Sequence, residues 1–335
     1  MKAYVVNEYG EDARFSEAEW PTPTASPGHV VIEVKASSLN PVDHKLLTSD
    51  RGINPPPPAI LHMDVAGVIA AVGEGVTDFQ AGDEVYGCAG GLQGEAGRLD
   101  GALADFMLAD ADLIALKPKR LSFTEAAALP LVSITAWEGL FDRAAIQPRQ
   151  SILIHAGVGG VGHIAIQLAK SHGLRVATTV SSADKAQLAR ELGADDIINY
   201  HQESVDDYVK RLTAGRGFDV IYDTVGGANL DRSLQAAAVH GQVISIIGHN
   251  QHDLSPMHTK GLSLHLVFML LPMITGQGRA HHGEILRQVA ELVDAGRLKP
   301  LLNQQRYRFA EVNEAHAAYA ANRYLGKIVL ENRAS

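Results

Sequence analysis

The chain has 335 residues, enough for about two domains, and 46% of them are hydrophobic, as in ordinary globular proteins. The formal net charge is −9, and lysine and arginine form no long runs, which argues against nucleic acid or an anionic membrane as the main partner. Cys88 is the only cysteine, so the chain can form neither an internal disulfide nor a thiolate zinc cage.

The first part of the chain, up to about residue 121, has the pattern of short strands and turns. The N-terminal residues lack the long apolar region of a signal peptide, which predicts a cytoplasmic protein. Prolines at 55–58 lack N–H donors and predict an extended loop, and the glycine-rich residues 87–101 favour a mobile loop. Strands are expected at 30–36, 65–72, 83–87 and 104–109.

A helical region follows, with Ser122 or Thr124 as its N-cap; Pro130 interrupts it and residues 134–145 resume it. From Ser151 onward strands and helices alternate, which predicts a doubly wound parallel sheet. The expected strands are 151–155, 175–180, 196–199, 219–223, 242–247 and 262–268, and the expected helices are 160–172, 182–192, 205–213 and 228–238.

The last part of the chain contains the most apolar stretch, residues 262–274. This stretch is interrupted by His265 and Pro272 and is too short to span a bilayer, so no membrane is expected as a partner. A loop over 248–260 precedes it. A helix at 284–295, another at 313–321 and a strand at 327–330 complete the expected elements.

A glycine turn between the first strand and helix of the alternating region carries the clearest functional signal. Gly157, Gly159 and Gly162 have the spacing of the dinucleotide-binding fingerprint. They permit a tight turn, close approach of a pyrophosphate, and close packing of helix against strand. The first helical N–H groups, including those of Gly160 and Val161, would hold the phosphates. The alternative is a glycine-rich turn without a ligand.

The end of the second alternating strand favours NADPH over NADH. NAD-specific folds place an acidic residue about 20 residues past the glycines, and none occurs here before residue 184. The strand ends at the uncharged Ser181 and Ser182, and Lys185 could act as a point charge on a 2′-phosphate. The negatively charged carboxylate of Asp184 would disfavour a phosphate at this place. Alternatively, Ser182 only caps the next helix and Lys185 is a solvated surface lysine.

Six segments together resemble the medium-chain dehydrogenase/reductase superfamily and, within it, the zinc-independent quinone oxidoreductase and enone reductase branch: residues 38–43, 64–68, 82–85, 129–136, 156–162 and 323–330. The resemblance covers essentially the whole chain. It implies an α/β protein with a GroES-like, β-rich catalytic domain over residues 1–123, to which residues 271–335 return. Residues 124–270 would form a Rossmann nucleotide-binding domain.

The resemblance also assigns cofactor contacts and an assembly. Lys185, Tyr200 and Arg323 would surround the 2′-phosphate, although Tyr200 could instead be a core aromatic residue. A homodimer would form by pairing of the last Rossmann strand, residues 262–268. Further contacts are expected at strand and helix ends, where the same residues could instead be caps or turn formers: Thr135, Asp223, Val225 and Gly248.

The resemblance also bears on zinc and catalysis. Zinc-dependent relatives carry their ligands at positions that correspond here to Asn40, Met63 and Leu131, none of which is a normal zinc ligand, so no metal site is expected. Without a Lewis acid, a hydrogen-bond donor must stabilise the oxyanion that forms. Lys45 is the candidate, because similar enone reductases carry lysine there whereas classical quinone reductases carry tyrosine. Asn40 and Asp43 would shape the turn and face the nicotinamide; alternatively they are turn formers and Lys45 is an ordinary exposed lysine.

These expectations describe an NADPH-dependent oxidoreductase that transfers hydride to a quinone or an α,β-unsaturated carbonyl compound without zinc. Two alternatives remain open. One is a zinc-free alcohol dehydrogenase or enoyl-thioester reductase, and the other is a non-catalytic NADPH-binding structural protein.

Overall fold

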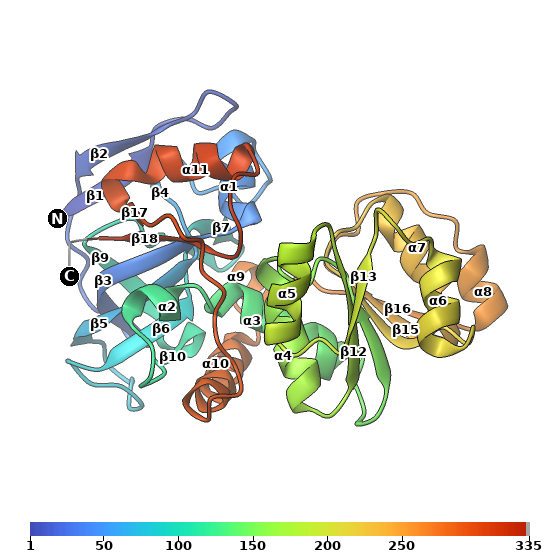
Figure 1. Ribbon diagram of the computed structural model, residues 1–335. Coiled ribbons are helices and arrows are strands. Elements are labelled where there is room, and N and C mark those ends of the chain that lie inside the picture. The colour runs from blue at the N-terminus through green and yellow to red at the C-terminus, as the bar shows by residue number, and fades with distance from the viewer. Residues whose placement is uncertain (333–335) are drawn as a thin grey trace. The chain divides into compact units, whose positions relative to one another are not determined.

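The computed structural model describes residues 1–332 and divides into two compact units (Figure 1). The first unit combines residues 1–131 with the chain from residue 270 onward, and the second is Val132–Met269. The chain therefore passes from the first unit to the second after residue 131 and returns after residue 269. The sequence analysis placed these two boundaries after residues 123 and 270.

The first unit is built on two sheets in which most neighbouring strands run antiparallel, as expected for a GroES-like domain. A three-stranded sheet has the order β2-β1-β4, with β1 at Lys2–Val6, β2 at Phe15–Glu19 and β4 at Ala59–Ile60. The larger sheet has the order β10-β6-β5-β3-β18-β17, and β9 also pairs with β3. Its strands are β3 (His29–Leu39), β5 (Asp64–Val72), β6 (Glu84–Cys88), β9 (Phe106–Asp110), β10 (Ile114–Leu116), β17 (Tyr307–Arg308) and β18 (Ile328–Glu331).

Helices of the first unit include one that the sequence analysis missed. Residues 41–48, where only a turn shaped by Asn40 and Asp43 was expected, form α1 (Pro41–Thr48), because Asn40 and Asp43 make a capping box and proline is tolerated in the first helical turn. The remaining helical segments are η1 (Ala111–Leu113), α2 (Phe123–Ala127, capped by Ser122), α9 (Leu271–Thr275), α10 (Arg279–Asp294), η3 (Phe309–Glu311) and α11 (Val312–Ala320).

The glycine-rich segment 87–101 was wrongly expected to be a mobile loop. It contains a hairpin of β7 (Leu92–Gly94) and β8 (Gly97–Leu99), and both Leu92 and Leu99 are buried. A Cβ added at Gly94 would overlap the backbone of Ile274, so this glycine serves close packing.

The second unit is the predicted doubly wound domain. Its six strands are all parallel, in the order β13-β12-β11-β14-β15-β16. They are β11 (Ser151–Ile154), β12 (Arg175–Val180), β13 (Asp196–Asn199), β14 (Phe218–Asp223), β15 (Ala237–Ser245) and β16 (Ser263–Leu266). Strand β15 begins five residues earlier than expected, because α7 ends at Ala236 and the pairing with β14 then shifts register between Phe218 and Val220.

Helices cover both faces of this parallel sheet. Figure 1 shows α4 (Gly160–Ser171) and α5 (Ala183–Glu191) on one side, and α6 (Val205–Thr213) and α7 (Ala228–Ala236) on the other. The expected loop 248–260 contains α8 (Ser255–Lys260). The helical region that begins with α2 is interrupted directly before Pro130, and helix α3 (Pro130–Trp137) resumes it at this proline rather than at residue 134. Helix α3 continues as a π-helical turn, Glu138–Arg143.

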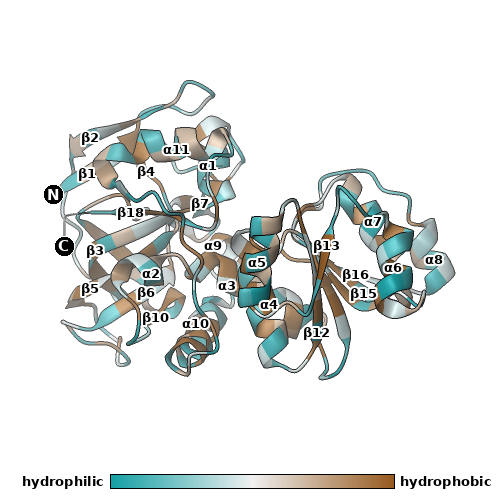
Figure 2. Cartoon of the chain, in the orientation of Figure 1, coloured by the Kyte–Doolittle hydropathy of each residue, from teal (hydrophilic) through white to brown (hydrophobic). Residues whose placement is uncertain are grey.

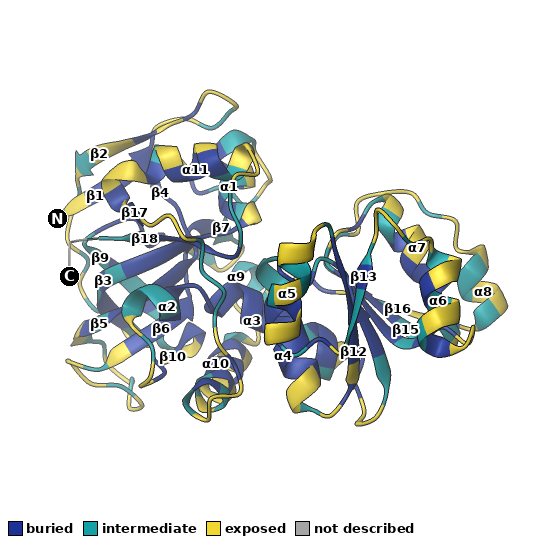
Figure 3. Cartoon of the chain, viewed as in Figure 1, coloured by how far each residue is buried: buried dark blue, intermediate teal, exposed yellow. Residues whose placement is uncertain are grey.

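The core of the second unit lies where α6 and α7 pack on the sheet. Leu153, Phe218, Ile221, Leu234 and Val243 are buried in one apolar cluster. Figure 2 shows hydrophobic residues along the strands and hydrophilic ones on the outer face of α6, and Figure 3 shows the matching change from buried to exposed. None of the helices among residues 1–332 is both long and apolar enough to cross a bilayer.

Candidate functional site

The glycine turn between β11 and α4 is held by close contacts that only glycine permits. A Cβ added at Gly157 would overlap Thr178 Oγ1, and one added at Gly162 would overlap the carbonyl oxygen of Ala156. A Cβ at Gly159 would lie 3.1 Å from the Ala156 oxygen and otherwise meet little. Helix α4 has 12 residues and no side-chain cap at its N-terminus, so its first N–H groups suit an anion.

The end of β12 holds the residues expected near a 2′-phosphate. Lys185 Nζ donates a hydrogen bond to Ser181 Oγ at 3.2 Å, so this ammonium is positioned at the strand end. Ser182 caps α5 by accepting a hydrogen bond from the Lys185 backbone N–H. This is the capping role that the alternative interpretation gave to Ser182. Asp184 is exposed on the first turn of α5.

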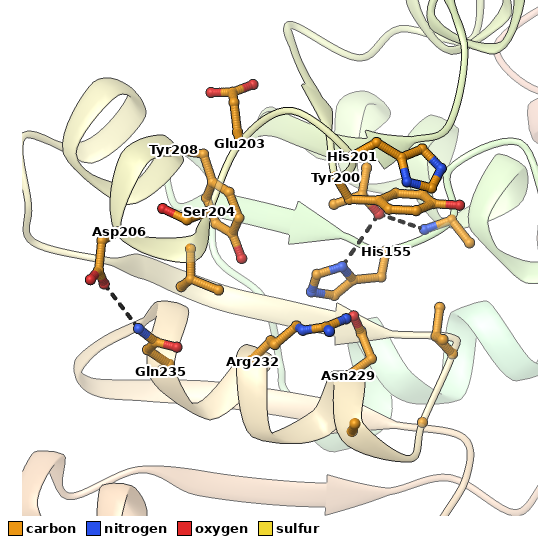
Figure 4. Close-up of a pocket in the computed structure, with 16 residues that line it drawn as sticks. His155, Tyr200, His201, Glu203, Ser204, Asp206, Tyr208, Asn229, Arg232 and Gln235 are labelled. Carbon is orange, nitrogen blue, oxygen red and sulfur yellow. Dashed lines mark hydrogen bonds between the residues drawn. The ribbon is translucent and has the colours of Figure 1, made fainter.

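A cavity of about 910 Å³ opens within the second unit, between α6 and α7 and the carboxyl ends of β11 to β14 (Figure 4). Two expected cofactor residues line it: Tyr200, whose side chain is 53% exposed, and Val225, which is 48% exposed. The exposure of Tyr200 rules out a buried core position. Its ring packs on that of His201, with a centroid distance of 4.4 Å.

Two basic side chains that received no role from the sequence also line this cavity. His155 ends β11 and is only 3% exposed; its Nδ1 lies 3.3 Å from Thr179 Oγ1, and its Nε2 has no hydrogen-bond partner among the described residues. Burial lowers the pKa of His155 to about 4, and the charge of Arg232 acts in the same direction while Asp223 opposes it. Figure 4 shows Arg232 reaching from α7 toward His155.

Asp223 is buried and fixes the turn that carries Val225. Its Oδ1 accepts from the N–H groups of Val225 (2.8 Å) and Gly226 (3.0 Å) and from Asn229 Nδ2 (3.0 Å). This carboxylate therefore shapes the cavity wall from behind rather than lining it.

Three further expected cofactor residues lie outside the cavity lining. Thr135 is buried on α3, and its carbonyl oxygen accepts from Tyr222 Oη at 2.7 Å. Gly248 is exposed beyond the end of β15. Arg323 is exposed in the first unit, between α11 and β18, whereas Lys185 and Tyr200 belong to the second unit. Their convergence on one phosphate stays a prediction.

In the first unit, Asn40 lies at the centre of a buried polar network. Its Nδ2 donates to Asp64 Oδ2 at 2.8 Å, and its Oδ1 accepts from Lys327 Nζ. Lys327 Nζ also donates to the Leu39 carbonyl at 3.2 Å and lies 3.7 Å from Asp64 Oδ2. All of these side chains are buried, and burial lowers the pKa of Lys327.

The two other expected catalytic residues differ sharply in environment. Asp43 is fully buried, and its carboxylate accepts from the backbone N–H of Asn40 at 2.7 Å and of Met63 at 3.2 Å. Burial raises the pKa of Asp43 to about 7, and the hydrogen bond from Asn40 acts in the opposite direction. Lys45 stands exposed two residues further along α1. The structure thus joins Asn40 and Asp43 and leaves Lys45 outside their network.

The donor set at the expected metal-ligand positions does not fit zinc. Both polar atoms of the Asn40 amide are engaged by Asp64 and Lys327, and the ammonium of Lys327 would repel a cation. Met63 is buried, and Leu131 offers only its backbone N–H, which donates to Asp64 Oδ1 at 2.9 Å. Within residues 1–332, no group of three or more His, Cys, Asp and Glu side chains could hold a metal ion.

The candidate site residues that sequence reasoning missed lack a local signal. His155 directly precedes the glycine turn and Lys327 lies in the C-terminal motif, but neither position reveals a partner. Lys327 meets Asn40 from 287 residues away, and Arg232 enters the cavity only because α7 packs beside α6.

Two family models match this chain. An alcohol dehydrogenase GroES-like domain matches residues 26–119, and a zinc-binding dehydrogenase matches residues 192–330. Among curated proteins, the chain is 33% identical to a 2-methylene-furan-3-one reductase from Solanum lycopersicum and 31% identical to a chloroplastic NADPH-dependent alkenal/one oxidoreductase from Arabidopsis thaliana. Each alignment covers 98% of this chain and 79% of the relative.

A human quinone oxidoreductase is 26% identical over 94% of this chain and 93% of its own length. Among solved structures, an alcohol dehydrogenase superfamily protein from Novosphingobium aromaticivorans superposes with a TM-score of 0.94 at 39% identity. That alignment covers 99% of this chain and 100% of the other.

Proposed function

This chain belongs to the medium-chain dehydrogenase/reductase superfamily, in its quinone oxidoreductase and enone reductase branch, and on that basis we propose that it reduces quinones or α,β-unsaturated carbonyl compounds with NADPH and without zinc. Oxidoreductase activity itself follows from the relatives' shared class. The preference for NADPH, the absence of a metal from catalysis and the substrate class are the proposal.

The observation that carries the proposal is the network of Asn40, Asp64 and Lys327. Where zinc-dependent relatives have a ligand, Asn40 is saturated by a buried ammonium and a buried carboxylate. Such a site favours chemistry in which hydrogen-bond donors, rather than a cation, stabilise charge on the substrate.

The glycine turn fits a dinucleotide, since Gly157, Gly159 and Gly162 carry no side chains and the turn leads into an uncapped helix N-terminus. Lys185, held on Ser181, supports a 2′-phosphate and hence NADPH. When bound, the nucleotide supplies the hydride. The protein's part is to orient the acceptor and to offer a donor to the oxygen on which charge develops; Lys45 is our candidate, because its ammonium is exposed and not committed to the Asn40 network.

A homodimer formed through β16 is part of the proposal. Strand β16 is the last strand of the parallel sheet and pairs only with β15 among the described residues. Leu266 and Phe268, 53% and 52% exposed, lie on and just after it. An apolar edge strand of this kind favours pairing with a second copy. The cytoplasmic location remains a prediction.

One assay with three acceptor conditions tests the proposal. NADPH oxidation is followed with a quinone, with an enone and with no acceptor, while binding of NADPH and NADH is measured in parallel. We expect acceptor-dependent oxidation, fastest with the enone, and tighter binding of NADPH. Binding without consumption for every acceptor would support a non-catalytic protein, and turnover confined to an alcohol or an enoyl thioester would support the other alternative.

Lys45→Met tests the candidate donor, and Lys119→Met, at another exposed lysine of the first unit, is the matched control. We expect the turnover number with enones to fall in the first variant alone. Equal turnover numbers in the two variants would remove Lys45 from the mechanism.

A further inference from the structure

Helix α1 is held to the rest of the first unit at two consecutive residues. The carboxylate of Asp43 accepts a hydrogen bond from the backbone N–H of Met63 at 3.2 Å. The neighbouring His44 contacts α11, which lies beside α1 in Figure 1: its Nδ1 is 3.1 Å from Nδ1 of His316, so the two imidazoles share one hydrogen bond. Successive side chains of a helix point about 100° apart. Two contacts in such different directions fix α1 against rotation about its axis.

The α11 end of this contact is itself fixed. The Asn313 side chain makes two hydrogen bonds, each of 3.0 Å, with the backbone of Phe15 on β2. The Phe15 ring packs against the His316 ring at a centroid distance of 5.1 Å. His316 is 4% exposed, and its Nε2 lies 2.9 Å from Nε2 of His62. Both nitrogens of the His316 imidazole are therefore engaged, and His44 meets a rigid partner.

His62 connects α11 back to the segment that Asp43 holds. It is fully buried and adopts a φ of 73°, in the left-handed region that is uncommon for residues other than glycine. Such a backbone persists only where its surroundings hold it, and here the His62 carbonyl accepts from the Ala102 N–H at 2.9 Å. Met63 is the next residue along the chain. The contacts thus form a closed cycle through Asp43, Met63, His62, His316 and His44.

Lys45 follows His44 on α1 and is exposed. Because the cycle fixes the two residues before Lys45, it also sets the direction in which the Lys45 side chain leaves the helix. We propose that His44, held by His316, is a positioning residue that aligns the Lys45 ammonium with the substrate oxygen on which charge develops. This inference rests on the proposed function, in which Lys45 is the candidate donor. Misplacing such a group by about 1 Å can lower a rate about 100-fold.

Two substitutions of His44 separate positioning from a contribution to folding alone. His44→Leu removes the hydrogen bond to His316, whereas His44→Asn places an amide near the former Nδ1 and retains it. We expect the turnover number with an enone and NADPH to fall about tenfold in His44→Leu and to stay within about twofold of wild type in His44→Asn. The KM for the enone should change little, because the donor acts on charge that develops in the transition state. The control His281→Leu, at an exposed histidine of the same unit, should behave as wild type.

The double variant Lys45→Met/His44→Leu shows whether His44 acts through Lys45. In the Lys45→Met background, His44→Leu should cause no further loss of turnover, because the group that His44 positions is absent. An equal loss with and without Lys45 overturns the proposal, as does a wild-type turnover number in His44→Leu. A loss that His44→Asn shares in full also overturns it.

Amide hydrogen exchange, measured without substrate, keeps this result apart from a failure of the proposed function. The amides of residues 42–48 in α1 should exchange about fivefold faster in His44→Leu than in wild type or His44→Asn, the effect of one lost hydrogen bond. Unchanged exchange in His44→Leu overturns the proposal even if turnover falls. A wild-type protein that reduces neither a quinone nor an enone refutes the proposed function instead, while the exchange rates still decide whether His44 holds α1.

Discussion

Acid should weaken the first unit through a chain of three histidines, and replacing His62 should remove much of that sensitivity. His44 Nδ1 lies 3.1 Å from His316 Nδ1, and His316 Nε2 lies 2.9 Å from His62 Nε2. His62 Nδ1 lies 3.4 Å from Ser37 Oγ, which donates to the Asp64 carbonyl at 2.7 Å. The chain thus connects α1, α11 and β3.

The proton positions follow from the end of this chain. Because the Ser37 hydroxyl donates to a carbonyl, it accepts from His62 Nδ1–H; His62 Nε2 then accepts from His316, and His316 Nδ1 accepts from His44. Each imidazole is neutral in this arrangement. A proton added to His62 or His316 would set two donors against each other.

The magnitude can be worked from His62, which is fully buried. Burial lowers its pKa to about 3, and the nearby charge of Lys327 contributes in the same direction; His316 is lowered by burial and by its two histidine neighbours. The unfolded chain binds a proton near pH 6.5 and the folded chain does not, so stability is full above that pH and falls as the pH drops toward 3. At pH 5 the loss from His62 alone is about 2 kcal/mol.

The assay uses the two tryptophans, because Trp20 belongs to the first unit and Trp137 to the second. In a Trp137→Phe background, urea unfolding followed by Trp20 fluorescence reports on the first unit. Between pH 7.5 and pH 5, this background should lose about 2 kcal/mol more stability than the same background carrying His62→Gln. The control is His281→Gln, at an exposed histidine of the same unit. The background that carries this substitution should lose as much stability between pH 7.5 and pH 5 as the background alone. Equal losses with and without His62 would refute the reasoning.

Three further outcomes are expected. Gly162→Ala should weaken NADPH and NADH alike by at least about tenfold in a binding titration, since the new Cβ overlaps the Ala156 carbonyl oxygen; retained affinity would show that the turn does not hold the nucleotide. Lys327→Met should destabilise the first unit by about 3–5 kcal/mol in urea unfolding, because the Asp64 carboxylate stays buried without its cation, and adding Asp64→Asn should recover part of the loss; no recovery would contradict the pairing. Leu266→Asp should convert the protein to monomers in sedimentation velocity, and a persistent dimer would exclude β16 as the interface.

The parallel-sheet unit was largely predictable from the sequence, because its signals are local. Strands and helices there alternate with clear periodicity, and α6 was expected over the residues it occupies. Residues 41–48 were missed as a helix because Asn, Pro and Asp also favour turns, and only the capping box between Asn40 and Asp43 decides between the two. The segment 87–101 was misjudged since its glycines reflect close packing, which composition alone does not reveal.

The candidate site likewise has parts that the sequence predicts and parts that only the folded structure reveals. The glycine turn and the strand end with Ser181 and Lys185 follow from motif spacing. The network of Asn40, Asp64 and Lys327 joins residues that are far apart in the chain. Its polar groups interact strongly only because they are buried, and the sequence does not reveal that burial. His155 combines the two cases. The sequence shows its position directly before the glycines, but only the folded structure shows that its Nε2 is buried without a hydrogen-bond partner among the described residues.

The most direct test of the account is turnover without metal. The purified protein is dialysed against a chelator, its zinc content is measured, and oxidation of NADPH by an enone is followed before and after zinc is added back. Because Lys327 already engages Asn40, we predict full acceptor-dependent oxidation in the zinc-free protein and no gain on adding zinc. Activity that disappears with the metal and returns with it in stoichiometric amount would contradict the account.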